Sequence, residues 1–130
     1  MAYYVDTSAF VKLVVRERHS AAMRAWAERH DGALFSCDLL RTEALRVARR
    51  HSTTALAEAR SRIEVLTLVV VTTDLFERAA DLDPEILRSL DALHLAAALS
   101  AGPDLDGIVT YDTHLADAAA QHGVAVLAPR

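Results

Sequence analysis

Apolar residues follow two alternating patterns along this chain, short continuous runs and stripes at helical spacing. Continuous runs are typical of buried strands, and the wider spacing is typical of helices with one apolar face. Strands are therefore expected at residues 2–5, 33–35, 65–72, 107–111 and 124–127. Helices are expected at residues 20–29, 73–80, 86–100 and 112–122, with others beginning at Ser8, at residues 36–38 (ending near Arg50) and at Ser52 or Thr53 (ending near Ile63).

The alternation of strands and helices continues through the whole chain. This order is typical of an α/β protein with a mainly parallel sheet and helices on both faces. Residues 65–72, VLTLVVVT, form the longest apolar run and predict a strand that is covered on both faces. No internal repeat or linker interrupts the pattern.

The segment at residues 86–100, ILRSLDALHLAAALS, is apolar nearly all round, which predicts a helix buried on most sides. Asp91 and His94 interrupt it at a spacing that places both side chains on one helix face. A buried ionised carboxylate is unstable without a partner. His94, Arg88 or a backbone amide would satisfy Asp91 in a purely structural role, and a bound cation would do so in a functional one.

Three further acids stand at unusual places. Asp6 and Asp112 follow expected strands, and ligand sites in parallel α/β folds lie beyond the carboxyl ends of strands. Each of these two residues is also well placed to cap the helix that follows it. Glu43 lies on the edge of an apolar helical stripe, where an exposed ion pair with Arg46 is the structural alternative.

Composition limits the possible functions. The 130 residues suit one domain, and 52% are hydrophobic, which is enough for a full core. The net charge of −4 argues against a protein that coats nucleic acid through a basic surface, and thirteen of the fourteen basic residues are Arg. Cys37 is the only cysteine, so no intrachain disulfide is expected. Because no signal peptide or membrane-spanning run is present, we expect a cytoplasmic protein.

Four carboxylates that converged in one place would repel one another and would cluster stably only around cations. Oxygen ligands without paired cysteines or histidines favour Mg²⁺ or Mn²⁺ over Zn²⁺. A carboxylate-bound divalent cation beside a phosphodiester can activate water and stabilise the departing oxygen. The acids therefore indicate phosphodiester hydrolysis, provided that they meet.

The chain resembles the PIN-domain ribonucleases, and most closely the VapC-type toxins of toxin–antitoxin pairs. The matching stretches are YYVDTSAFVKLVVRE, LLRTEALRVARR, LRSLDALHLAAAL and IVTYDTHLADAAAQHGV, which occur in the family's order and cover nearly the whole chain. The resemblance places the catalytic, metal-binding quartet on four acids and carboxylate-orienting or water-orienting hydroxyls on two further residues: Asp6, Glu43, Asp91 and Asp112, with Ser8 and Thr110.

The same resemblance implies a fold, an activity and partners. The expected fold is a three-layer α/β/α sandwich with a mainly parallel sheet of about five strands, formed by residues 1–130 as a single PIN-like domain. The expected activity is a Mg²⁺- or Mn²⁺-dependent endoribonuclease. Homodimers and an antitoxin that blocks the site are the expected partners. Lys12, one turn into the first helix, is a weaker candidate for a contact with a phosphate of the RNA.

Other classes of protein share parts of this pattern. A phosphoacceptor receiver domain needs an Asp that ends the middle strand and a Lys that ends a late one, but residues 65–72 end in Thr72 and the only lysine is Lys12. A phosphatase of the haloacid dehalogenase type needs a second Asp where Ser8 stands. A catalytically silent binding module, whose acids only cap helices, stays open, and metal titration would distinguish it from an enzyme.

Overall fold

A computed structural model describes residues 1–130, which form a five-stranded sheet in the order β3-β2-β1-β4-β5. All four pairs of neighbouring strands are parallel. The strands are β1 (Ala2–Val5), β2 (Leu34–Cys37), β3 (Thr67–Val69), β4 (Leu105–Val109) and β5 (Val126–Leu127). The helices are α1 (Thr7–Val14), α2 (Ser20–Arg29), α3 (Leu39–His51), α4 (Thr53–Val65), α5 (Thr73–Ala80), α6 (Ser89–Leu99) and α7 (Thr113–Gln121), with a 3₁₀ turn at Gly102–Asp104.

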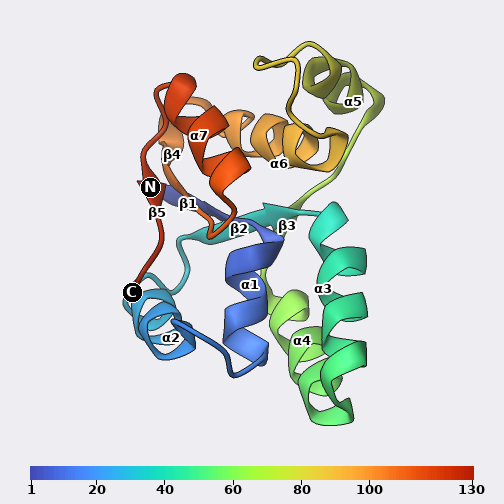
Figure 1. The fold of residues 1–130 in the computed structure, drawn as a ribbon, viewed down its shortest axis with the longest axis vertical. Helices are drawn as coiled ribbons and strands as arrows, with labels where there is room; N and C mark the ends of the chain where they lie inside the picture. Colours follow the sequence, from blue (N-terminus) through green and yellow to red (C-terminus); the bar gives the residue numbers. More distant parts are fainter.

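Helices cover both faces of the sheet, which confirms the predicted three-layer α/β/α architecture. Figure 1 shows α5, α6 and α7 on one side of the strands, and α1, α2, α3 and α4 on the other. Two separate groups of buried apolar side chains lie between these layers and the sheet. Successive strand residues point to opposite faces, so Tyr4 and Ile108 join the core under α6, and Val5 and Val109 join the core under α1.

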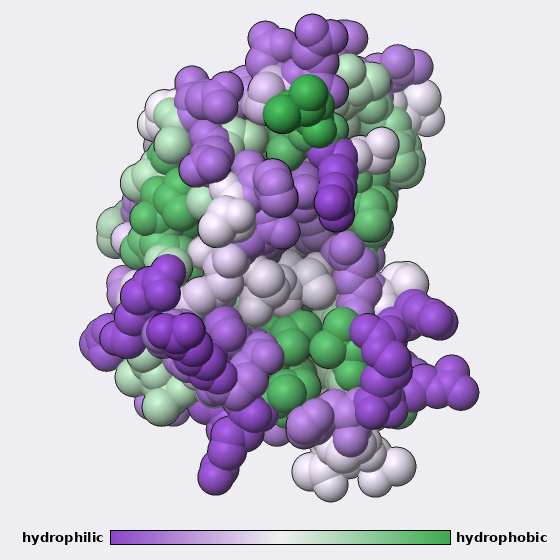
Figure 2. Space-filling view, in the orientation of Figure 1, coloured by the Kyte–Doolittle hydropathy of each residue, from purple (hydrophilic) through white to green (hydrophobic).

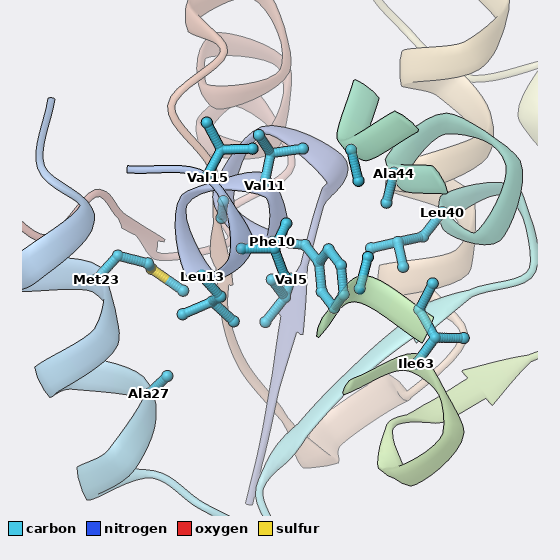
Figure 3. Close-up of a cluster of buried hydrophobic side chains, with 14 of the residues drawn as sticks. Val5, Phe10, Val11, Leu13, Val15, Met23, Ala27, Leu40, Ala44 and Ile63 are labelled. Carbon is cyan, nitrogen blue, oxygen red and sulfur yellow. The ribbon is translucent and has the colours of Figure 1, made fainter. Parts of the chain in front are cut away.

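The core on the α1 side is centred on α1 itself. Phe10 is 2% exposed and points toward Leu40 of α3 and Ile63 of α4 (Figure 3). Ala44 of α3 is fully buried in the same cluster. Because Glu43 directly precedes Ala44 in α3, this packing also fixes the position of Glu43 relative to the sheet.

Several predicted boundaries are confirmed, and the first helix cap is corrected. The helices at Ser20–Arg29 and Thr73–Ala80 have the predicted bounds, and Ser52 caps α4 by accepting a hydrogen bond from the Ala55 amide at 3.0 Å. Ser8 does not cap α1. The helix begins at Thr7, and the Asp6 carboxylate accepts the Ala9 amide at 3.0 Å instead, which is the capping role weighed for Asp6 above.

The prediction of a long, doubly covered strand at residues 65–72 is wrong. Helix α4 continues to Val65, and only Thr67–Val69 pair with β2, at the edge of the sheet. Val65 is 86% exposed and Val70 is 65% exposed. As an edge strand, β3 pairs with one neighbour instead of two. Thr72 already caps α5, so the strand ends before the predicted boundary at residue 72.

Helix α6 is shorter than predicted and is buried mainly in its second half. It begins at Ser89, whereas Ile86 lies before it with 90% of its surface exposed. Its buried residues run from Ala92 to Ala98. The first turn, which carries Asp91, is therefore the partly open end of an otherwise buried helix. No helix of the structure combines the length and the apolar character that a membrane crossing requires.

Candidate active site

The four predicted acids belong to elements that meet at the carboxyl ends of the central strands. Asp6 directly follows β1, and Asp112 follows the neighbouring strand β4. Glu43 is on α3 and accepts a hydrogen bond from Thr7, the residue after Asp6, at 2.7 Å. Asp91, in the first turn of α6, is close enough to Asp112 for the two charges to interact. Figure 2 shows that hydrophilic residues cover the centre of this face, above an apolar area over α1.

Asp6 is almost fully enclosed by hydrogen-bond donors. It is 4% exposed, and its Oδ1 accepts the Ser8 hydroxyl at 2.7 Å besides the Ala9 amide. Its Oδ2 accepts the Thr110 hydroxyl at 2.5 Å. Burial raises the pKa of Asp6 above its ordinary value, and the hydrogen bonds from Thr110 and Ser8 act in the opposite direction. The carboxylate is thus held in one orientation by three donors.

Ser8 and Thr110 also join the ends of β1 and β4. The Ser8 Oγ accepts the Tyr111 amide at 2.9 Å, and the Thr110 Oγ1 accepts the Asp112 amide at 3.0 Å. The two hydroxyl oxygens are 3.3 Å apart. These contacts tie the backbone before Asp112 to the site of Asp6, and both hydroxyls donate to the Asp6 carboxylate.

Asp112 has one oxygen in a structural role. Its Oδ1 caps α7 by accepting the Leu115 amide at 2.9 Å, which confirms the helix-capping alternative for this residue. Its Oδ2 makes no hydrogen bond within the protein, and the side chain is 39% exposed. Capping and ligand binding are therefore compatible here, because they use different oxygens.

Asp91 has no hydrogen bond or salt bridge with any residue of the chain, including the neighbours His94 and Arg88 that were considered as its partners. Burial raises the pKa of Asp91 above its ordinary value, and the nearby Asp112 charge raises it further. The charges of His94 and Arg88 act in the opposite direction, and Glu43 adds a smaller effect that raises the pKa. A carboxylate with like charges nearby and no hydrogen-bonded partner is the feature that a cation would stabilise.

Glu43 is held by two donors, and neither is Arg46. The His94 Nε2 and the Thr7 hydroxyl each lie 2.7 Å from the same oxygen, Oε1. Burial acts to raise the pKa of Glu43, but the hydrogen bonds from His94 and Thr7 dominate and lower it. Glu43 therefore stays ionised on a half-buried helix face.

The sequence singles out His94 as a possible partner of Asp91, but its partners in the structure are other residues. It is 3% exposed and bonds to Glu43 and, through Nδ1, to the Tyr4 hydroxyl at 2.7 Å. Burial alone would lower the pKa of His94, but Cys37 and Glu43 outweigh it and raise the pKa to about 10. The useful signal was a histidine inside a run of buried alanines and leucines, since a buried polar group requires a partner.

Lys12 makes no salt bridge or hydrogen bond with any of the four carboxylates. It is 8% exposed, and its Nζ donates to the Arg18 carbonyl at 2.7 Å. The same ammonium is 3.5 Å from the Glu17 carboxylate and 4.5 Å from the centre of the Tyr111 ring. These contacts account for the charge of Lys12, and its contact with a phosphate stays a prediction.

The chemistry of the donors fits a hard divalent cation, although no three His, Cys, Asp or Glu side chains of this structure are arranged to hold a metal ion. All four acids offer carboxylate oxygens, the ligands that Mg²⁺ and Mn²⁺ prefer. The unpartnered Asp91 and the unbonded Oδ2 of Asp112 supply oxygens that the protein does not use itself. Binding would require the acids to draw closer together.

The molecule also has a pocket that none of these acids lines. It has a volume of about 570 Å³ and lies between α5, the segment at residues 81–89 and α6, lined by residues such as Phe76, Leu82 and Leu93. We assign the chemistry to the four acids, because phosphodiester hydrolysis by a bound cation needs the carboxylate oxygens that they supply, and none of them lines this pocket.

Comparison with known proteins identifies the family of the chain. The family model for the PIN domain matches residues 3–121. Ribonuclease VapC46 from Mycobacterium tuberculosis (strain ATCC 25618 / H37Rv) is 39% identical over 128 residues, which cover 98% of each chain. Ribonuclease VapC47 from Mycobacterium tuberculosis (strain CDC 1551 / Oshkosh) is 33% identical over 130 residues, which cover 97% of this chain and 96% of the relative.

A solved structure shows the same fold. The crystal structure of Mycobacterium tuberculosis VapC20, described as a Sarcin-Ricin loop cleaving toxin, superposes with a TM-score of 0.77 at 19% identity. The superposition covers 98% of this chain and 100% of that one. Matches to the family model and to relatives over nearly their full length show that the chain belongs to the PIN-domain family.

Proposed function

We propose that this protein is a metal-dependent endoribonuclease that hydrolyses RNA phosphodiester bonds, and that it is the toxin of a toxin–antitoxin pair. The observation that carries the proposal is Asp91, an unpartnered carboxylate beside Asp112 at the carboxyl ends of the central strands. The names of the relatives, which are VapC ribonucleases matched over nearly the full chain, support the substrate class.

Asp6, Glu43, Asp91 and Asp112 are the residues that would hold a Mg²⁺ or Mn²⁺ ion. The chemistry that such an ion supplies when bound is the activation of water and the stabilisation of negative charge on the departing oxygen. The residues of the chain itself orient the carboxylates. Asp6 is held in a fixed orientation, because Ser8, Thr110 and the Ala9 amide donate to it.

The partly open first turn of α6 leaves Asp91 accessible to a polymer, whereas Asp6 is buried. We therefore assign Asp91 and Asp112 to the substrate-facing side of the site and Asp6 to its floor. Glu43 contributes its carboxylate to the site from α3 and accepts hydrogen bonds from Thr7 and His94. In this arrangement, the acids come from β1, β4 and two helices on opposite faces of the sheet.

The proposed partners are RNA, a second copy of the chain and a cognate antitoxin that blocks the carboxylates, and the proposed location is the cytoplasm. The net charge of −4 implies that few phosphates are neutralised by the protein surface. Binding of RNA is therefore expected to be of modest affinity and to depend weakly on salt. The antitoxin would supply the opposite charge, because the site presents an excess of carboxylates.

Expression in cells that lack the antitoxin tests this proposal. The wild-type chain should arrest growth, and the Asp91→Asn chain, expressed to the same level, should not. Sequencing of RNA ends after brief induction should show new 5′ ends that are absent from the Asp91→Asn culture. Growth arrest by both chains, without new RNA ends, would point to a silent binding module or to toxicity unrelated to cleavage.

A further inference from the structure

The buried histidine of α6 contacts one of the four acids but is not one of them. His94 joins α6 to α3 through the 2.7 Å bond to Glu43, and joins α6 to β1 through the 2.7 Å bond to Tyr4. Tyr4 is fully buried, and its hydroxyl also lies 3.2 Å from the Cys37 Sγ of β2. The imidazole is thus fixed at one nitrogen by the sheet and presents the other nitrogen to Glu43.

The direction of the bond to Glu43 follows from the groups involved. An ionised carboxylate can only accept hydrogen bonds, so the His94 Nε2 must carry a proton and donate it. Thr7 donates to the same oxygen, Oε1. No donor of the protein bonds to the second oxygen, Oε2. Two donors therefore fix one oxygen and leave the other oxygen of the same carboxylate available.

We infer that His94 is a positioning residue for the metal site, which holds Glu43 so that Oε2 faces the cation. This inference rests on the proposed function, because it needs Glu43 to be a metal ligand. A glutamate side chain has several rotatable bonds, and ordering them costs conformational entropy. Fixing Oε1 before the cation arrives removes part of that cost from metal binding.

A purely structural role would be to satisfy a buried polar group in the core. That role predicts a loss of stability when His94 is replaced, but no specific loss of metal affinity in a variant that still folds. The positioning role predicts that metal affinity depends on a hydrogen-bond donor at the position of the His94 Nε2. Glutamine places its amide nitrogen near the position of the His94 Nε2. Asparagine is one carbon shorter and places its amide nitrogen near the position of Nδ1, beside Tyr4.

The test is calorimetric titration of the purified full chain with Mn²⁺, after removal of metal with EDTA, for wild type, His94→Asn and His94→Gln. Loss of an outer hydrogen bond to a metal ligand typically weakens metal affinity about 10–100-fold, which is the result expected for His94→Asn. His94→Gln should stay within about threefold of wild type, because it keeps the donor. His30→Asn, a histidine change in α2's terminal turn away from the acids, is the matched control and should leave the affinity unchanged.

Equal Mn²⁺ affinity in wild type and in folded His94→Asn would overturn the inference and leave the proposed function standing. No Mn²⁺ binding by wild type would overturn both. If His94→Asn does not fold, Tyr4→Phe decides, since it keeps the ring and removes only the hydroxyl that fixes Nδ1. A drop in Mn²⁺ affinity in folded Tyr4→Phe supports the inference, and an unchanged affinity overturns it.

Discussion

At the residue scale, the four acids differ in how many of their oxygens the protein already uses. Both oxygens of Asp6 accept hydrogen bonds, whereas Glu43 and Asp112 each keep one oxygen free. Asp91 keeps both. An acid in the first turn of a helix usually gains about 0.3–1 kcal/mol from the helix dipole. The raised pKa of Asp91 means that burial and repulsion outweigh that gain.

Removal of the Asp91 charge should therefore stabilise the metal-free fold. Because the folded pKa of Asp91 lies above the ordinary value of 3.8, its ionised form costs stability at neutral pH, and the cost disappears as falling pH protonates the carboxyl. Asp91→Asn should melt above wild type at pH 7 in EDTA, and the difference should shrink toward pH 4. Scanning calorimetry across this range checks it. A lower melting temperature for Asp91→Asn at pH 7 would indicate a structural role.

Lys12 offers a second test at this scale. Its ammonium is buried and donates to the Arg18 carbonyl, and hydrogen bonds to charged groups contribute about 1.5–3 kcal/mol. Lys12→Met keeps the length of the side chain and should lower the free energy of unfolding by about 1–3 kcal/mol, with little change in KM for RNA. Urea unfolding and cleavage kinetics measure the two effects. A raised KM with unchanged stability would instead support the predicted phosphate contact.

The sequence was informative for residues whose role depends on the end of a strand. Asp6 and Asp112 were located by their position after apolar runs, and this needs no knowledge of distant contacts. The partners of His94 were not predicted, because Tyr4 and Glu43 are 90 and 51 residues away in sequence. The i, i+3 spacing suggested Asp91 as its partner, but the structure contains no such bond.

At the element scale, local signals predicted the helices better than the strands. The bounds of α2 and α5 follow from the residues that begin and end them. The edge strand β3 was wrongly predicted, because an apolar run carries no information about how many neighbours a strand has. The order β3-β2-β1-β4-β5 depends on crossovers that no local pattern specifies.

The cap of α4 gives a prediction for one element. Ser52→Ala removes the acceptor of the Ala55 amide and should cost about 0.5–2 kcal/mol. Thr53→Ala, at the next position, is the matched control and should change stability much less, since the Thr53 side chain makes no hydrogen bond. Chemical denaturation of both variants measures this. Equal losses would mean that Ser52 is not the energetically important cap.

At the scale of the whole molecule, the site joins the two helical layers. Glu43 belongs to the layer of α1 and α3, and Asp91 to the layer of α6, with Asp6 at the end of β1 between them. A cation held by all three would link both layers to the sheet. The alternation of elements predicted a parallel sheet with helices on both faces, but this distribution of the acids depends on the strand order.

Divalent cations should therefore stabilise the whole fold. A ligand that binds only the folded state at a hundred times its Kd adds about 2.7 kcal/mol. Saturating Mn²⁺ should raise the melting temperature of wild type and should have a smaller effect on Asp91→Asn, which has one charge fewer. Ca²⁺-free buffers exclude a competing cation, and a sample in EDTA gives the melting temperature without metal. An equal rise in both proteins would indicate nonspecific binding elsewhere on the acidic surface.

The most direct test of the central claim is cleavage of a structured RNA by wild type and Asp6→Asn, purified identically. Asparagine keeps an acceptor for Ser8 and Ala9, so the fold should survive, but it lacks the charge that holds a hard cation. Wild type should cleave in Mg²⁺ or Mn²⁺, stop in EDTA and recover when metal returns, whereas Asp6→Asn should not cleave. Equal activity in the two preparations, or activity that survives EDTA, would contradict the account.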